Sequence, residues 1–244
     1  MMGQKSMKLQ YLCAAALGVM LIAGTASAAT VSVNTDNSTV LTTTSLTQFA
    51  TYGDDMDGMV VTAKFADGTT QQAAWGTTGA NAGGAIGSLF SLTLTGDTYT
   101  ANWHLTNLND TSRLTQLTIN AAPGNTVFDI ISSPDTTPGS ASGRAFVDRS
   151  AGVTGSISVL YSNPVALTGE DPLHDIYALL MADFLGLDGG GLAFDTAYLF
   201  GADTDNSSTR ISSVPLPGAL PLLMIALGML GIMMRGRRPA SASA

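Results

Sequence analysis

The sequence predicts an all-β domain, an antiparallel β-sandwich or jelly-roll-like fold, flanked by an N-terminal signal helix and a C-terminal transmembrane helix. Runs of alternating apolar and polar residues recur along the middle of the chain, and successive side chains of a strand face opposite sides of a sheet. Threonine, which favours strands, fills many of the polar positions. Turn residues separate the runs at short intervals, as they do in sandwiches and jelly rolls.

The strands are expected in the following order. Two tight hairpins have strands at 59–65 and 69–75 around Asp67-Gly68, and at 89–95 and 98–106 around Gly96-Asp97. Single strands are expected at 117–121, 127–131, 144–147, 157–161 and 192–200. The segment 174–187 fits either a strand or a short helix, and 132–143 is expected to be a loop because Ser, Thr, Pro and Gly fill it.

The charge of the central segment excludes some classes of protein. Residues 29–214 carry all eighteen acids of the chain but only five bases, a net charge of −13. Binding of nucleic acid is disfavoured, because a polyanion needs concentrated Lys and Arg. The single cysteine, Cys13, lies near the N-terminus, so a disulfide-stapled miniprotein is excluded as well.

The N-terminus has the layout of a secretory signal peptide. Lys5 and Lys8 precede an apolar run, which is followed by Ala26-Ser27-Ala28-Ala29. A basic start, an apolar core and small residues of the A-x-A type are the three parts of such a signal. We expect cleavage after Ala28, which leaves a mature chain without cysteine.

The C-terminus predicts a membrane anchor. Val214-Pro215-Leu216-Pro217 precedes the uncharged stretch 218–234, whose 17 residues are the lower limit for a helix that spans a bilayer. Arg235, Arg237 and Arg238 follow it, and basic residues favour the cytoplasmic side. The domain between the two apolar segments is therefore expected outside the inner membrane.

This three-part tail resembles the PEP-CTERM class of sorting signals, specifically its VPLPA variant, although Gly218 stands where that variant has alanine. The resemblance covers about 25 residues and implies an exosortase, a membrane-embedded cysteine transpeptidase of Gram-negative bacteria, as processing partner. It implies that the chain is exported, held by the C-terminal helix, cut near the motif and passed to the cell surface or the extracellular matrix. Proteins of this class accompany exopolysaccharide, so the resemblance also implies a polysaccharide partner.

The expected organisation therefore has five parts. They are a signal peptide at 1–28, a β-rich exported domain at 29–202, a polar tether at 203–213, a sorting signal at 214–238 with its transmembrane helix at 218–234, and a tail at 239–244.

No pattern of catalytic residues is present, and we expect a protein that is not an enzyme. The sequence lacks the G-x-S-x-G and H-E-x-x-H motifs, and His104 and His174 are expected to be exposed polar residues. A carbohydrate-active enzyme would need paired carboxylates; Glu170 and Asp171 are adjacent in the chain, but any two of the eighteen acids could meet in space. That enzyme class remains an alternative.

Calcium is the one cofactor that the sequence suggests. Asp203 and Asp205 are expected just after a strand, and Asp55 and Asp57 just before another. Calcium prefers hard oxygen ligands, often from loop aspartates, whereas solvated acidic loops are the plain alternative. Among the aromatic residues, Trp75 is the best candidate for an exposed platform that could stack on a sugar.

These observations favour a structural or adhesive protein of the cell envelope. An acidic domain rich in Thr and Gly stays hydrated and could be crosslinked by divalent cations. A calcium-dependent carbohydrate-binding module is the second alternative.

Overall fold

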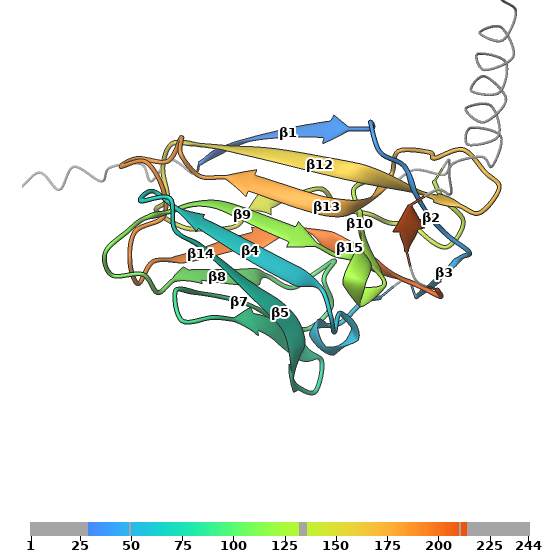
Figure 1. Cartoon of the computed structure of the whole chain (residues 1–244), viewed down its shortest axis with the longest axis horizontal. Helices are drawn as coiled ribbons and strands as arrows, with labels where there is room; N and C mark the ends of the chain where they lie inside the picture. The colour runs from blue at the N-terminus through green and yellow to red at the C-terminus, as the bar shows by residue number, and fades with distance from the viewer. Residues whose placement is uncertain (1–28, 49, 132–135, 210, 214–244) are drawn as a thin grey trace, which may run out of the picture.

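The computed structural model describes residues 29–48, 50–131, 136–209 and 211–213, and these form an all-β domain (Figure 1). Two short 3-10 helices, η1 (Gly53–Asp55) and η2 (Ala122–Gly124), are the helical elements among them. The strands are β1 (Thr30–Asp36), β2 (Leu41–Thr43), β3 (Leu46–Gln48), β4 (Val60–Phe65), β5 (Thr70–Gly79), β6 (Ala82–Ile86), β7 (Phe90–Thr95), β8 (Trp103–Asn107), β9 (Leu114–Asn120), β10 (Thr126–Asp129), β11 (Val147–Asp148), β12 (Ser156–Leu167), β13 (Ile176–Asp183), β14 (Ala197–Gly201), β15 (Asp203–Ser207) and β16 (Ser212–Ser213).

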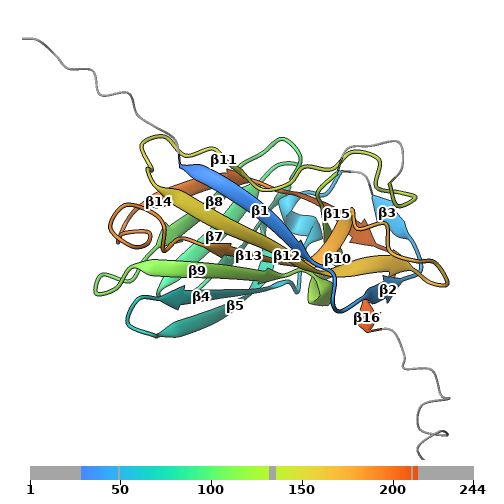
Figure 2. The ribbon, with the colours of Figure 1, turned by 90° about the horizontal axis from the view of Figure 1, so that it is seen from above.

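The strands form one continuous curled sheet in the order β11-β14-β8-β7-β6-β5-β4-β9-β13-β10-β15-β3, with β12 beside β13. Neighbours are antiparallel, except that β1 and β2 both pair with β12 in parallel. The twelve-residue strand β12 follows the long axis of the molecule, and β1 and β2 lie on successive parts of it (Figures 1 and 2).

β5 turns the sheet back on itself. Its first half pairs with β4, as in Val60↔Ala74, and its second half pairs with β6, as in Trp75↔Ala85. Because one strand serves both parts, the layer of β4, β9, β13 and β12 faces the layer of β7, β8 and β14 (Figures 1 and 2). This arrangement is consistent with a β-sandwich.

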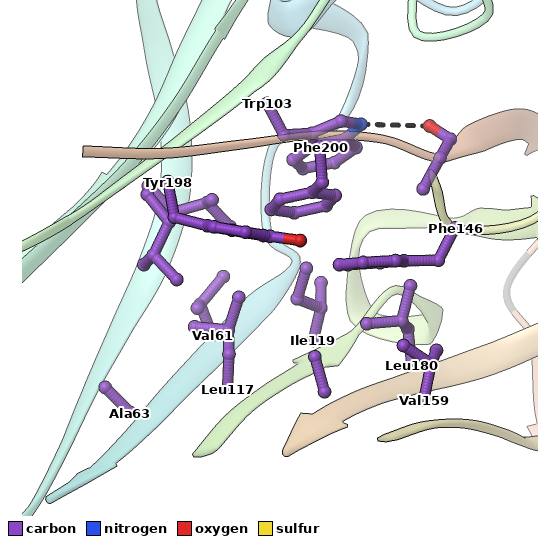
Figure 3. Close-up of a cluster of buried hydrophobic side chains, with 14 of the residues drawn as sticks. Val61, Ala63, Trp103, Leu117, Ile119, Phe146, Val159, Leu180, Tyr198 and Phe200 are labelled. Atoms are coloured by element: carbon purple, nitrogen blue, oxygen red, sulfur yellow. Dashed lines mark hydrogen bonds between the residues drawn. The ribbon is translucent and has the colours of Figure 1, made fainter. Parts of the chain in front are cut away.

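The space between the layers holds the main core, in which aromatic side chains meet aliphatic ones (Figure 3). Trp103 of β8 stacks on Phe200 of β14 with ring centroids 5.7 Å apart, and Phe146 stacks on Phe200 at 4.7 Å. The indole N–H of Trp103 donates to the Ala202 carbonyl at 2.9 Å, which satisfies the one polar group of that ring. The aliphatic side comes from the opposite layer: Val61, Leu117, Ile119, Val159 and Leu180.

A smaller apolar cluster lies at the end of the domain where β2, β3, β10 and β15 meet. Its buried members are Val127, Val165, Ile176, Ala178 and Ile211. β10 separates the two cores, because Phe128 points into the main core whereas its neighbour Val127 belongs to the smaller one.

Several predicted elements are confirmed. The Asp67-Gly68 turn joins β4 to β5, and the ambiguous segment 174–187 contains the strand β13. The second hairpin is partly right: β7 pairs with β8, but β8 begins only at Trp103. Residues 97–101 form a turn instead, in which the Ala101 N–H donates to the Asp97 carbonyl.

One expectation about the end of the domain is wrong. Residues 203–207 are not part of a polar tether but form the buried strand β15, which pairs with β10 and β3. Ser212–Ser213 forms β16 against β2. Polar composition misled the prediction, because the strand is stabilised by backbone pairing on both sides rather than by apolar side chains.

The segments predicted to be a signal peptide (1–28) and a sorting signal (214–238, with the apolar stretch 218–234) lie outside the described residues. Ala29 is the first residue that is described. Within the described part of the chain, no helix has the length and hydropathy needed to cross a bilayer.

Candidate functional site

Four aspartates are buried at the end of the domain that holds the smaller apolar cluster. Asp129 ends β10, Asp175 directly precedes β13, and Asp203 and Asp205 lie on β15. Each is at most 2% exposed. We call these four residues the aspartate cluster. They are a candidate site because charged groups are almost never buried this fully without a partner.

Strand register brings the cluster together. Asp129 of β10 is directly opposite Asp203 of β15, and side chains opposite each other share a face of the sheet. Asp205 is two residues further along and shares that face too. Asp175 arrives from the other side, because its neighbour Ile176 is paired with Asp129.

The described part of the loop before β11 covers the cluster and donates hydrogen bonds to it. The Ser140 hydroxyl donates to Asp129 Oδ2 at 2.6 Å. Thr137 donates twice to Asp175, from its N–H at 2.5 Å and from its hydroxyl at 2.7 Å. At Gly143 the backbone lies so close to the Asp129 carboxyl that an added Cβ would collide with it.

Two carboxylate oxygens of the cluster have no hydrogen-bond partner among the described residues. They are Asp203 Oδ2 and Asp205 Oδ2. The other oxygen of Asp203 accepts from the Thr98 hydroxyl at 2.9 Å. A buried, unpartnered carboxylate oxygen is costly unless a proton or a cation binds to it.

Burial raises the pKa of three of these carboxyls, to about 6 for Asp129, about 7 for Asp203 and about 8 for Asp205. Negative charge on the neighbouring aspartates raises the pKa values further, and hydrogen bonds from Ser140 and Thr98 partly oppose the increase. The charges that act on the three groups are all negative. The cluster therefore retains protons near neutral pH in the absence of a cation.

The donor set suits a hard cation such as calcium, which prefers carboxylate and hydroxyl oxygens. In the described residues, however, no three His, Cys, Asp or Glu side chains are grouped closely enough to hold a metal ion. A cation could bind here only after the carboxylates had rotated toward one another. Of the predicted calcium ligands, Asp203 and Asp205 are brought together, on a buried strand rather than in a loop.

Asp55 and Asp57 lie elsewhere and hold the backbone around η1. Asp55 Oδ2 accepts from the Tyr52 N–H at 2.9 Å. Asp57 Oδ1 accepts from the Thr77 hydroxyl at 3.0 Å, and the neighbouring Asp54 accepts from the Asn81 N–H at 3.0 Å. Each carboxylate thus bonds a different segment, which gives this acidic loop a structural role.

The structure also shows how far the other candidate residues of the sequence are buried or exposed. Trp75 is not an exposed platform: it is 2% exposed, and its indole N–H donates to the Gly53 carbonyl at 2.8 Å. His104 and His174 are exposed, and so are Glu170 and Asp171 in the loop between β12 and β13. Asp129 and Asp175 were missed as cluster members, although an acid flanked by apolar residues, as in Phe128-Asp129-Ile130, is a signal that could have found one of them.

Comparison of the chain with family models, with curated proteins and with solved structures found no match.

Proposed function

We propose that the protein is an exported, non-enzymatic component of the cell surface or extracellular matrix, sorted by an exosortase-type system and associated with polysaccharide. One observation supports it most. In the tail of the sequence, the motif Val214-Pro215-Leu216-Pro217, the uncharged stretch 218–234 and the basic residues Arg235, Arg237 and Arg238 follow one another in the order of a sorting signal. Removal of both terminal segments would leave every described strand intact.

The domain also has properties that such a location requires. It contains no cysteine after Cys13, and the large aromatic core supplies stability without a disulfide. The excess of acids over bases favours hydration and solubility outside the cell.

Mass spectrometry of the native protein from the envelope and extracellular fractions tests the proposal. We expect an N-terminus at Ala29 and a C-terminus near 214–218. The matched variant replaces Arg235, Arg237 and Arg238 with alanine and should retain the C-terminal segment. A mature protein that still ends at Ala244 contradicts sorting and indicates a plain membrane anchor.

We propose cation binding as a second function, because two buried carboxylate oxygens of the aspartate cluster have no hydrogen-bond partner among the described residues. At pH 8, millimolar calcium should raise the melting temperature of the purified protein, since the ion binds the folded state preferentially. Asp203→Asn and Asp205→Asn should abolish the increase, whereas Asp57→Asn, in the loop with its own hydrogen bonds, should leave it intact. Identical melting curves in calcium and in chelator would rule the site out.

A further inference from the structure

Phe194 is the one exposed aromatic side chain among the described residues. It is 53% exposed, whereas the other aromatic rings described are buried or half-buried. A single exposed apolar residue needs no explanation by itself. Phe194, however, lines a surface hollow, and in that location its ring could contact a bound ligand.

Phe194 lines one of two adjoining surface hollows, and both hollows are lined by Arg113 and Ala193. The first, of about 170 Å³, is lined by Phe194, Asp110 and Thr111, and the second, of about 150 Å³, by Leu187, Asp188 and Thr154. Both are smaller than the ~300–1,000 Å³ of sites that enclose a whole small molecule. Shallow adjoining hollows suit successive units of a chain that lies across the surface.

The loops that carry these residues are fixed from beneath. The buried side chain of Asn107 donates to the carbonyls of Ser112 and Leu192 at 3.0 and 2.9 Å, so it crosslinks the two loops. Leu114 and Leu192 exchange backbone hydrogen bonds at 3.0 and 2.8 Å. A binding surface that is already ordered loses little conformational entropy when a ligand binds.

Arg113 is held flat between the hollows. Its Nη1 donates to the Gly191 carbonyl at 2.9 Å, and its guanidinium packs on Gly189, where an added Cβ would lie 3.0 Å from it. Gly189, Gly190 and Gly191 all have positive φ, which lets this loop wrap around the guanidinium. With five N–H donors, Arg113 retains donors for a ligand beside the one bond to Gly191.

The chemistry of the surface matches a sugar. A pyranose ring presents C–H groups on its face and hydroxyls at its edge, and the C–H groups are attracted to the negative face of an aromatic ring. Hydroxyls both donate and accept, so they can use the N–H groups of Arg113 and the carboxylate of Asp110 together. Asp110 and Asp188 line the hollows and outnumber their single base, Arg113, which disfavours an anionic ligand.

We propose that the two hollows around Arg113 bind neutral sugar units of a polysaccharide, with one ring stacked on Phe194 and its hydroxyls bonded to Arg113 and Asp110. This inference rests on the polysaccharide association proposed above and assigns it to a surface. Phe194 acts here as a contact residue for the ligand, and Asn107 acts as a positioning residue.

Affinity electrophoresis of the full chain, purified in a mild detergent, tests the proposal. The gels contain dextran, galactomannan or xylan as neutral probes and alginate or polygalacturonate as anionic ones. We expect at least one neutral polysaccharide to retard the wild-type protein. Phe194→Leu, which keeps an apolar side chain but removes the ring, should weaken that retardation about tenfold, and Phe194→Trp should preserve it.

Leu173→Ala is the matched control, because Leu173 is also 53% exposed. Leu173 lies in the loop that precedes β13, whereas Phe194 lies in the loop that follows β13. Equal melting temperatures of the variants would show that the fold is unchanged. Retardation that Phe194→Leu leaves intact overturns this site but not the association with polysaccharide. Absence of retardation by all three neutral probes, or retardation by the anionic probes alone, overturns the inference, whereas the termini found by mass spectrometry test sorting independently.

Discussion

The two buried regions of the domain differ in what they bury. The main core joins stacked aromatic rings to aliphatic side chains, and its two indole N–H groups each have a backbone acceptor. The smaller region places four carboxyls beside five apolar side chains and leaves two carboxylate oxygens unpartnered. β10 contributes Phe128 to the first and Asp129 to the second. A strand that is buried on both faces therefore need not be hydrophobic on both. We expect the stability of the main core to depend on side-chain packing and that of the smaller region to depend on pH.

Removal of the central ring should have the largest effect. Trp103→Ala deletes a fully buried indole that stacks on Phe200 and contacts Trp75, and the expected loss of unfolding free energy is about 3–5 kcal/mol. Urea unfolding of the two proteins measures it. The exposed Leu173→Ala should change stability by no more than about 0.5 kcal/mol. A loss at Trp103 as small as that of the control would show that the aromatic stack is not the main source of stability.

The aspartate cluster should make stability depend on pH. Because the pKa values of Asp129, Asp203 and Asp205 are raised to about 6, 7 and 8, the folded state binds more protons than the unfolded state above pH ~4. The stability contributed by these groups is fully present below that pH and is lost as the pH rises through the folded values. Without calcium, the protein should therefore unfold more easily at pH 8.5 than at pH 5.

Asp205→Asn sharpens this comparison. The amide cannot ionise, so the variant should exceed the wild type by about 1–3 kcal/mol at pH 8.5, and the difference should shrink at pH 5. Urea unfolding at the two pH values measures both effects, with the exposed Asp57→Asn as control. A wild type that gains stability as the pH rises from 5 to 8.5 would contradict the burial of this carboxyl.

The smallest effect is expected at Trp75. Trp75→Phe keeps an aromatic ring in the main core but removes the donor to the Gly53 carbonyl, so we expect a loss of about 1 kcal/mol at either pH. Thermal unfolding at pH 5 and pH 8.5 measures the change. A loss that appears at only one pH would link the main core to the titration of the cluster.

The sequence predicts the half-buried strands best. β4 and β7 alternate in residue type because one face packs on the main core and the other is partly exposed. β6, with two glycines, and β15, with the sequence Asp-Thr-Asp-Asn-Ser, carry no such alternation and were missed. Their pairing is a property of the assembled sheet rather than of the segment.

The candidate site was only half predictable for the same reason. Asp203 and Asp205 attract attention because they are close in sequence. Asp129 and Asp175 join them through the pairing of β10 with β15 and of β10 with β13, which connects residues far apart in the chain. Local pattern also cannot show whether an acid is solvated, and Asp57 and Asp205 look alike until burial separates them.

β12 connects two opposite ends of the domain. It starts next to the Gly155↔Leu187 bridge, close to the hollows, and ends beside β2, which also pairs with β16. Twelve residues of strand span about 40 Å, so β16 lies at the opposite end of the molecule from the loop between β13 and β14, which carries Phe194 (Figure 2). In the proposed anchored state, the bilayer would hold the chain just after Ser213 and Phe194 would lie far from the lipid. Phe194 could then contact the extracellular matrix before the protein is released by proteolysis.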